Sequence, residues 1–488
     1  MDVKDKLFIG GDWVSPAGSG VIEVISPHTE KVIATVPDGT TADMDAAVAA
    51  ARHTFDETDW SRMPAAERLE IVQRFCDLYA SKMMEMAALI TDEMGSPITF
   101  SQLAQSPAPW MMLDSFLKIG GETQWEEERM GVLGSPVIVR REAVGVVAAI
   151  VPWNVPQFVI MSKLAPALVA GCTMVLKPAP ETPLDAWLLA EIVAEAGIPA
   201  GVLNIVAAGR EVGEHLVRHP GIDKVAFTGS TAAGRTIASI CGEQLKRYSL
   251  ELGGKSAAII LDDADLAATM EGLKFASLMN NGQACVAQTR ILASRGKYAE
   301  VVDALGEMVK GMSVGDPHDP ATEIGPLVAE RQQERVEKYI ALGQEEGARV
   351  VVGGNGRPDG MEKGWYVQPT VFADVSNDMR IAREEIFGPV LAVIPYDSVD
   401  DAVRIANDSE YGLAGSVWTA DVEVGMDIAR RVRTGTYGVN QYTMDFVAPF
   451  GGYKSSGVGR EFGKEGLEHY LELKSIVPPA GSHVQMAV

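Results

Sequence analysis

Short apolar runs alternate with helical patterns between Gly145 and Glu251, and this alternation constrains the fold more than any other feature of the chain. The apolar runs predict strands at residues 146–151, 173–176, 202–206 and 224–227, with helices at 156–171 and 184–196 and another after the last strand at 232–241. Thr182 and Pro183 have the residue types of an N-cap and a first helical position for the second of these helices. Strands joined by helices in this way indicate a parallel, doubly wound α/β sheet.

A second alternating series begins at residue 256 and continues to about residue 439, which predicts a second α/β domain. Its first strand is expected at 256–261, with helices near 264–278, 298–312 and 400–407. More than one domain agrees with the length, because 488 residues exceed what a single core usually holds.

Two segments fit neither series. Residues 126–141 alternate like an extended hairpin around a turn at 133–136, and the tail from Leu471 is apolar at intervals without a core to join. Because exposed strand edges pair readily with other chains, both segments are expected to contact another subunit.

Composition excludes several classes of partner. A formal net charge of −24 disfavours nucleic acid, which requires a basic patch, and anionic lipid. The four cysteines, Cys76, Cys172, Cys241 and Cys285, are too few and too scattered for a disulfide framework and contain no Cys-x-x-Cys pair. We therefore expect reduced thiols in a cytoplasm, no bound metal and, from the charged first residues, no secretory signal.

The uncharged stretch 143–162 is long enough to cross a bilayer, but Pro152, Asn154 and Pro156 interrupt it near its centre. Unpaired backbone and amide groups are costly in lipid, so a strand that enters a buried turn explains the stretch better. No membrane association is expected.

Cys285 is the strongest candidate nucleophile. It follows the polar, glycine-containing turn at 280–283, whereas Cys241 lies in a helical pattern and Cys172 follows a helix stop, which is typical of packing residues. Glu251 is either a solvated carboxylate at a strand end or, because leucines flank it, a buried one with a raised pKa that could serve as a general base.

The segment 229–234 follows a predicted strand and begins a helix, so its free N–H groups could bind phosphate or pyrophosphate. It is neither a Walker loop nor Gly-x-Gly-x-x-Gly, and a simple strand–helix turn remains an equal alternative. Asn154 could cap the following helix or donate to a developing oxyanion. Lys177 lies at the carboxyl end of the predicted sheet, where ligands bind, and Glu385 supplies a carboxylate suited to ribose hydroxyls.

These motifs together resemble the NAD(P)-dependent aldehyde dehydrogenase superfamily over essentially the whole chain. The resemblance is carried by the segments 152–154, 177–178, 227–230, 250–255, 282–285, 384–389 and 449–452. It implies an α/β fold of two Rossmann-like parallel-sheet domains with a small β oligomerisation element, and a homo-oligomer, either a dimer or a tetramer. The implied division is 1–124 with 144–252 for the cofactor, 253–455 for catalysis, and 125–143 with 456–488 for oligomerisation.

The resemblance also implies a mechanism. Cys285 attacks the aldehyde carbon, Asn154 and the Cys285 N–H hold the oxyanion, and Glu251 activates the water that hydrolyses the thioester. Lys163 and Glu461 match positions that support the active site or relay protons. The implied cofactor is NAD, with NADP possible, and the matching cofactor positions are Val151, Pro152, Trp153, Lys177, Pro180, Gly209, Arg210, Gly229, Ser230, Leu252, Glu385 and Phe387.

The chain departs from the family pattern at Pro180, where many members have a glutamate that binds the adenosine ribose and repels a 2′-phosphate. Glu181 is one residue late and is expected to point away, and Arg210 is expected near the adenosine end. We therefore expect activity with both cofactors, with NAD preferred.

Small or apolar residues at the predicted tunnel suggest a medium-sized or bulky apolar aldehyde as the small-molecule substrate. Phe158, Met161 and Phe446 are expected to add to an apolar lining, with Asp445 as a polar exception. The predicted pocket residues are Val155, Val159, Ser162, Ala284, Val286, Met444 and Phe450.

Two alternatives belong to other functional classes. A CoA-acylating semialdehyde dehydrogenase does not need a water-activating base, so Glu251 argues against it. A non-catalytic structural protein of the same fold would be expected to lose Cys285, Glu251 and Asn154, which are all present. Cofactor-independent ester turnover would reveal an esterase side activity at Cys285.

Overall fold

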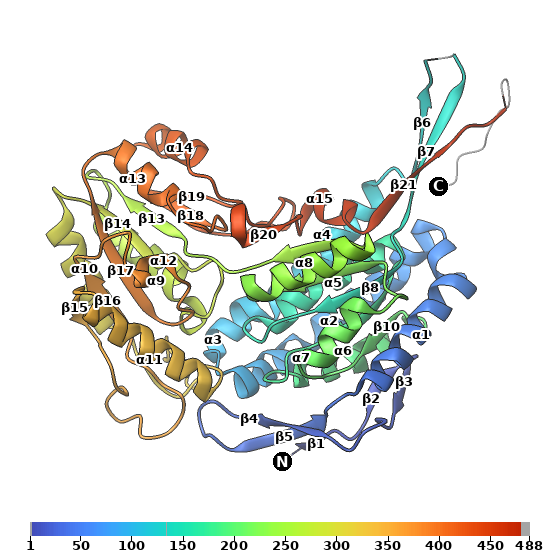
Figure 1. The fold of residues 1–488 in the computed structure, drawn as a ribbon, viewed down its shortest axis with the longest axis horizontal. Helices are drawn as coiled ribbons and strands as arrows, with labels where there is room; N and C mark the ends of the chain where they lie inside the picture. The colour runs from blue at the N-terminus through green and yellow to red at the C-terminus, as the bar shows by residue number, and fades with distance from the viewer. Residues whose placement is uncertain (1, 133, 480–488) are drawn as a thin grey trace.

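The computed structural model describes residues 2–132 and 134–479, and these residues form two large parallel sheets with helices around them (Figure 1). A small antiparallel sheet projects away from the main body, with a second small sheet near the N-terminus. The α/β class expected from the sequence is therefore confirmed.

The first large sheet has the order β20-β12-β11-β8-β9-β10-β2-β3, and its central strands, β12 to β10 in this order, are parallel. The strands β8 and β9 are buried along their whole length, as expected for parallel strands covered on both faces. The bounds are β2 (Leu7–Ile9), β3 (Asp12–Val14), β8 (Val146–Ile150), β9 (Thr173–Lys177), β10 (Leu203–Ile205), β11 (Lys224–Thr228), β12 (Arg247–Glu251) and β20 (Gly457–Val458).

Helices pack in two groups against this sheet. Both groups contact its strands, and one consists of α1 (Thr41–Glu57), α7 (Arg210–Arg218) and α8 (Thr231–Gln244). The other consists of α5 (Pro156–Ala170) and α6 (Leu184–Glu195), which are themselves contacted by α2 (Ala65–Met94), while α4 (Pro107–Glu122) packs on α5 and α2. The stretch 143–162 is thus a strand, a turn and the start of a helix, and among the described residues no helix is long and apolar enough to span a membrane.

The predicted cap of α6 was wrong. Thr182 donates from its hydroxyl to the carbonyl of Trp153, 3.4 Å away, and Pro183 precedes the helix. The backbone N–H groups of Leu184 and Asp185 instead donate to the carboxylate of Glu93, at 2.8 and 3.0 Å. An acid from the end of α2 therefore caps this helix, which local sequence cannot reveal.

The second large sheet has the order β15-β16-β17-β14-β13-β18-β19, and all neighbours except β15 and β16 are parallel. The strand and helices predicted there are present, with ends shifted by at most about two residues. The strands are β13 (Ala257–Ile260), β14 (Arg290–Ser294), β15 (Arg349–Val352), β16 (Thr370–Ala373), β17 (Val390–Tyr396), β18 (Gly415–Trp418) and β19 (Gly438–Val439). The helices are α9 (Leu266–Leu278), α10 (Tyr298–Lys310), α11 (Glu330–Glu345), α12 (Arg380–Arg383), α13 (Val399–Asn407) and α14 (Val422–Arg431).

The projecting sheet contains the predicted hairpin and the C-terminal strand. Its order is β21-β7-β6, with β6 (Glu126–Met130), β7 (Pro136–Ala143) and β21 (Leu471–Ile476), all antiparallel. The range 456–488 is not one bridging segment, because β20 joins the first large sheet and α15 (Gly463–Glu468) packs on α4 and α5. Residues 480–488, and Leu133 in the predicted turn, lie outside the described residues.

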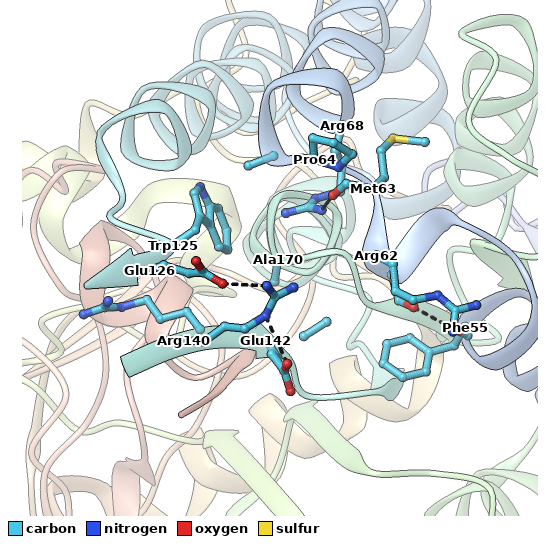
Figure 2. Close-up of a pocket in the computed structure, with 14 residues that line it drawn as sticks. Phe55, Arg62, Met63, Pro64, Arg68, Trp125, Glu126, Arg140, Glu142 and Ala170 are labelled. Carbon is cyan, nitrogen blue, oxygen red and sulfur yellow. Dashed lines mark hydrogen bonds and ion pairs between the residues drawn. The ribbon is translucent and has the colours of Figure 1, made fainter. Parts of the chain in front are cut away.

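A cavity of about 370 Å³ lies at the foot of this hairpin (Figure 2). Arg140 of β7 reaches Glu126, at 2.7 Å, and Glu142, at 3.1 Å. Across the cavity, Arg68 of α2 lies 5.2 Å from the ring of Trp125 and donates to the carbonyls of Met63 and Val169. These contacts fix the direction in which the hairpin leaves the body.

The small sheet near the N-terminus has the order β1-β5-β4, with β1 (Asp2–Val3), β5 (Val32–Pro37) and β4 (Val21–Ile25). Its strands β4 and β5 are antiparallel.

Candidate active site

A cavity of about 200 Å³ brings together most of the predicted catalytic and pocket residues. Its wall is predominantly apolar, with Cys285, Glu251, Asn154 and Glu461 as the chemically active groups. The predicted pocket residues that line it are Val155, Val159, Ala284, Val286, Met444 and Phe450, together with Phe158 and Phe446.

Ser162 was predicted to line the pocket, and this was wrong. Its side chain is fully buried within α5, where the hydroxyl donates to the Val159 carbonyl at 2.8 Å. Met161 is equally buried and away from the cavity wall. Asp445 is exposed and accepts from the Val447 N–H, so it is not the expected polar exception in the lining.

Cys285 follows a turn with unusual backbone geometry. Asn280 and Asn281 both adopt left-handed conformations, with φ of 56° and 63°, which few residues other than glycine occupy. Asn281 is fixed by two donations, to the carbonyls of Gly95 and Pro326 at 3.0 and 2.9 Å, and by accepting from the Gly325 N–H at 2.6 Å. The turn is therefore held from both halves of the molecule.

Cys285 is partly exposed as a whole residue, whereas Cys76, Cys172 and Cys241 are buried. Burial of the sulfur raises the pKa of Cys285 to about 12, and the charges of Glu385 and Glu251 add to this effect. The resting group is therefore a thiol, and its reaction requires a nearby proton acceptor.

Glu251 ends β12 at the cavity wall. Its side chain is buried, and neither carboxylate oxygen has a side-chain hydrogen-bond partner among the described residues. Burial raises the pKa of Glu251 well above its usual value, and repulsion from Glu461 adds to the shift. The buried alternative for this carboxylate is thus the one that the structure shows.

Lys163 lies behind the cavity, on α5, and is fully buried. Its ammonium donates to Glu461 at 2.6 Å and to the Thr228 hydroxyl at 2.7 Å. Because Glu461 and Thr228 also line the cavity, Lys163 is connected to it through them.

Asn154 donates from its side-chain amide to the Gln283 carbonyl, at 2.9 Å, two residues before Cys285. Helix α5 begins at Pro156 with Val155 in the cap position, so Asn154 lies before the cap. Its amide is buried and is directed at the cysteine turn, where it could donate a hydrogen bond to an oxyanion.

The remaining predicted residues lie along the carboxyl edge of the first sheet and the facing loop. Lys177 ends β9, donates to the Ala208 carbonyl at 2.7 Å, and has a pKa lowered to about 8 by burial. Ser230 caps α8, and Gly209 precedes α7, so two helices begin at this edge. The exposed N-terminus of α8 is suited to a pyrophosphate.

The loop that contains Glu385 and Phe387 faces this edge from the second sheet. Glu385 accepts from the Gly254 N–H at 2.9 Å, and burial raises its pKa. Phe387 adopts a φ of 68° and packs edge-on against Trp153, with ring centroids 5.4 Å apart. Gln332 of α11 donates to the Phe387 carbonyl at 2.7 Å and fixes the loop.

Glu181 forms an ion pair with Arg331, at the start of α11. It is thus directed at α11. Pro180 is partly exposed, and Arg210 is exposed at the start of α7.

One wall of the cavity was missed from the sequence. It comes from the segment after α2 and from α9, where Leu103, Met111 and Phe275 are exposed apolar side chains. The sequence does contain a signal for this wall. Gly95 and Pro97 indicate the end of a long helix, and apolar residues follow them among polar ones. The missed lining residues are Phe100, Leu103, Ala104, Gln105, Ala108, Met111, Phe275, Met279, Tyr442 and Thr443.

Within residues 2–132 and 134–479, no group of three or more His, Cys, Asp or Glu side chains could hold a metal ion.

Comparison with known proteins identifies the class. Residues 13–476 match the model of the aldehyde dehydrogenase family, and the chain belongs to that family. It is 48% identical to geranial dehydrogenase of Castellaniella defragrans, over 96% of this chain and 98% of that protein.

Solved structures agree. An aldehyde dehydrogenase of Mycobacterium tuberculosis in complex with NAD+ superposes with a TM-score of 0.97 at 52% identity, covering 99% of this chain and all of that one. A variant of aldehyde dehydrogenase C from Pseudomonas syringae, in complex with NAD+ and octanal, gives 0.95 at 41% identity, with 98% of each chain covered.

Proposed function

We propose that this enzyme oxidises a medium-sized or bulky apolar aldehyde to the carboxylic acid, with NAD+ as the preferred oxidant. The observation that carries the proposal is a mostly apolar cavity of about 200 Å³ with a partly exposed cysteine and a buried carboxylate on one wall. Relatives named for geranial and crystallised with octanal act on or bind apolar aldehydes, which supports the substrate class.

The proposed mechanism assigns a role to each polar group in the cavity. The Cys285 thiol gives its proton to a water molecule in the cavity, and the sulfur adds to the aldehyde carbon, whose oxygen gains the negative charge. The Asn154 amide and the Cys285 N–H donate to that oxyanion. Glu251 then accepts a proton from water, which attacks the thioester carbon, releases the acid and returns the thiol.

Bound NAD+ would supply the hydride acceptor that converts the thiohemiacetal into the thioester. The structure fits such a dinucleotide in two respects. The N-terminus of α8 at Ser230 is exposed and suited to a pyrophosphate, and Glu385 and Lys177 face the same cleft with groups that bind hydroxyls. Further contacts are proposed for Val151, Pro152, Trp153, Pro180, Gly209, Arg210, Gly229, Leu252 and Phe387.

The domain division follows from these roles. We propose that the first large sheet and its helices bind the cofactor, that the second carries the nucleophile, and that the projecting sheet joins subunits into a dimer or tetramer. A cytoplasmic location, which the free cysteines favour, is part of the same proposal.

The deciding experiment is a panel of linear, branched and aromatic aldehydes with NAD+ or NADP+, followed by the absorbance of reduced cofactor. Apolar aldehydes of eight or more carbons should give the highest kcat/KM, because each buried CH2 contributes about 0.8 kcal/mol, or about fourfold, up to the size of the cavity. Full burial of the six additional CH2 groups of an eight-carbon aldehyde would raise kcat/KM by up to about 10³-fold over acetaldehyde. Highest activity on short or charged aldehydes would contradict the substrate class. Product formation that requires added CoA would assign the enzyme to the acylating type.

Cofactor choice is tested with Pro180→Glu. A carboxylate at this position should tighten NAD+ and suppress NADP+, because it accepts from ribose hydroxyls and repels a 2′-phosphate. Direct binding titrations of both cofactors, by protein fluorescence, separate affinity from turnover. Complete rejection of NADP+ by the unaltered enzyme would show that another residue, such as Glu181, excludes it.

A further inference from the structure

Gln105 is a buried amide in the apolar wall of the substrate cavity. It ends a π-helical turn (Ser101–Gln105) that is closed by a hydrogen bond from the Ser106 N–H to the Ser101 carbonyl, at 3.1 Å. Its side chain is 2% exposed, yet the residue lines the cavity. Such turns insert one residue into a helix and often mark functional sites.

Gln105 is connected to the catalytic turn through one hydrogen bond. Its Nε2 donates to Oδ1 of Asn280, at 3.2 Å. The Nδ2 of Asn280 donates in turn to the backbone carbonyl of Asn154, at 2.8 Å, and weakly to that of Gln283, at 3.4 Å. The Gln283 carbonyl is also the acceptor for the Asn154 side chain, at 2.9 Å.

These bonds fix which way round each amide lies. The Asn154 carbonyl can only accept, so Asn280 must present its NH2 to it and its oxygen to Gln105. Gln105 must therefore present its NH2 to Asn280. Asn280 is only 2% exposed, so loss of the Gln105 donor would leave its Oδ1 buried without that partner. This cost favours a rotation of the Asn280 side chain that brings Oδ1 to another donor.

Such a rotation would carry Asn280 Nδ2 away from the Asn154 carbonyl, to which it donates at 2.8 Å. The loop from Val151 to Val155 would then shift or the left-handed turn at Asn280 would relax. Either change moves the Asn154 amide relative to Cys285, where donors for an oxyanion act over a narrow range of distance.

We propose that Gln105 is a positioning residue for aldehyde oxidation: through Asn280 it orients Asn154 and the cysteine turn, and it links the substrate wall of the cavity to the oxyanion site. The inference rests on the proposed role of Asn154. The proposed role of Gln105 is to position other groups, because its side chain is connected to the reacting atoms only through Asn280.

The first test compares Gln105→Leu with the unaltered enzyme. Removing one such hydrogen bond should lower kcat by about three- to tenfold, with KM for the aldehyde and the directly titrated affinity for NAD+ changed little. A change in KM alone would overturn the proposal, because it would show that Gln105 only shapes the wall. Gln102→Leu, an exposed residue on the same turn, is the matched control and should retain full activity.

Gln105→Glu provides a readout that a packing role would not change. A protonated carboxyl can donate to Asn280 Oδ1, whereas an ionised one cannot. The kcat of this variant, relative to the unaltered enzyme, should therefore approach unity at low pH and fall as the pH rises. The Leu variant should show a constant ratio, and a constant ratio for the Glu variant would refute the proposal.

A double-variant cycle shows whether the effect passes through Asn154. If it does, Gln105→Leu should cost little further activity in an Asn154→Ala background, so the two losses should not multiply. Fully multiplicative losses would overturn the proposal. An Asn154→Ala variant with unchanged activity would instead refute the oxyanion role itself, which separates the two failures. Circular dichroism and NAD+ binding confirm that each variant is folded.

Discussion

At the scale of single residues, the chemistry depends on burial. Cys285 and Glu251 share one cavity, and burial favours the protonated form of both. A buried carboxylate with a raised pKa is a stronger base than one in water, and this suits it to remove a proton from a thiol or from water.

Replacing Cys285 with alanine should abolish aldehyde oxidation, because the sulfur forms the covalent intermediate. Binding of NAD+ and the unfolding temperature should change little, since the side chain is small and the residue is partly exposed. Steady-state turnover and fluorescence titration measure the two properties. If the variant retained activity and substrate labelled Cys172 or Cys241 instead, the assignment of the nucleophile would be wrong.

Glu251→Gln should separate the two half-reactions. If Glu251 activates water, a single turnover of reduced cofactor should appear as a burst, followed by steady-state turnover lowered by about 10²- to 10⁴-fold. Rapid mixing with absorbance detection resolves the two phases. Loss of the burst would show that Glu251 acts first on Cys285, and unchanged turnover would place the base elsewhere.

The pH profile tests the same residue without mutation. A general base works only when ionised, so kcat should rise with pH through a pKa well above the usual glutamate value. A kcat that is already maximal near pH 5 would show that the raised pKa of buried Glu251 does not control the pH dependence of kcat.

At the scale of elements, buried carboxyls join helices from different parts of the chain. Glu93 of α2 caps α6, and Asp185 of α6 accepts from Gln157 of α5, at 2.7 Å. Both acids are fully buried, and burial raises the pKa of Asp185 to about 7 and that of Glu93 well above its usual value. Tyr79 lies near Asp185, and the charges of Asp185 and Asp92 raise the pKa of Glu93 further.

This pair should make stability depend on pH. The folded state keeps a proton that the unfolded state releases above about pH 4, so unfolding becomes easier as the pH rises from about 4 toward 7. Asp185→Asn should flatten this part of the profile while keeping an acceptor for Gln157. Thermal unfolding across this pH range measures the pH dependence of stability. An unchanged slope of unfolding temperature against pH in the variant would assign the effect to other groups.

Elements with strong local signals were predictable, and long-range contacts were not. The strands around Val146 and Lys224 were predicted from apolar runs alone, because parallel strands are buried on both faces. Cys285 could be distinguished from Cys241 by its polar turn. The cap of α6 and the inward direction of Ser162 could not be predicted, because both depend on residues or helix faces that meet only in the folded chain.

The cavity wall formed by Gln105 and Phe275 illustrates the same limit. These residues are 170 positions apart and come from the two halves of the molecule, so neither periodicity nor a motif could pair them. Their common role follows from how the segment after α2 packs against α9.

At the scale of the whole molecule, the projecting sheet is the part with no core of its own. Its outer strand β21 leaves Leu473 and Ile476 exposed, at 68% and 39%, and Val477, directly after the strand, is 72% exposed. Apolar side chains on a free sheet edge are unfavourable in water and are usually covered by another chain. The exposed pair of Arg247 and Glu472, at 2.7 Å, ties this strand to β12, which also carries Glu251.

Leu473→Asp should therefore lower the oligomeric state, because it places a charge in the proposed subunit contact. Light scattering after size-exclusion chromatography gives the mass directly. Met84→Asp, on a comparably exposed apolar residue of α2, is the matched control and should leave the mass unchanged. An unaltered enzyme that is monomeric would refute the role of the sheet in assembly.

The turn at Asn281 also affects the chemical stability of the enzyme during storage. Asn281 precedes Gly282, and asparagine followed by glycine is the sequence that most readily loses its amide to become aspartate. In this structure the amide donates to two carbonyls, so a carboxylate in its place would face two oxygens with no proton to offer. The folded chain should thus protect Asn281 from deamidation. In an unfolded or partly opened molecule, deamidation of this one residue should prevent the active turn from re-forming. Stored enzyme should lose activity in step with conversion at this position, as measured by peptide mass spectrometry, and bound cofactor should slow both if it stabilises the closed fold.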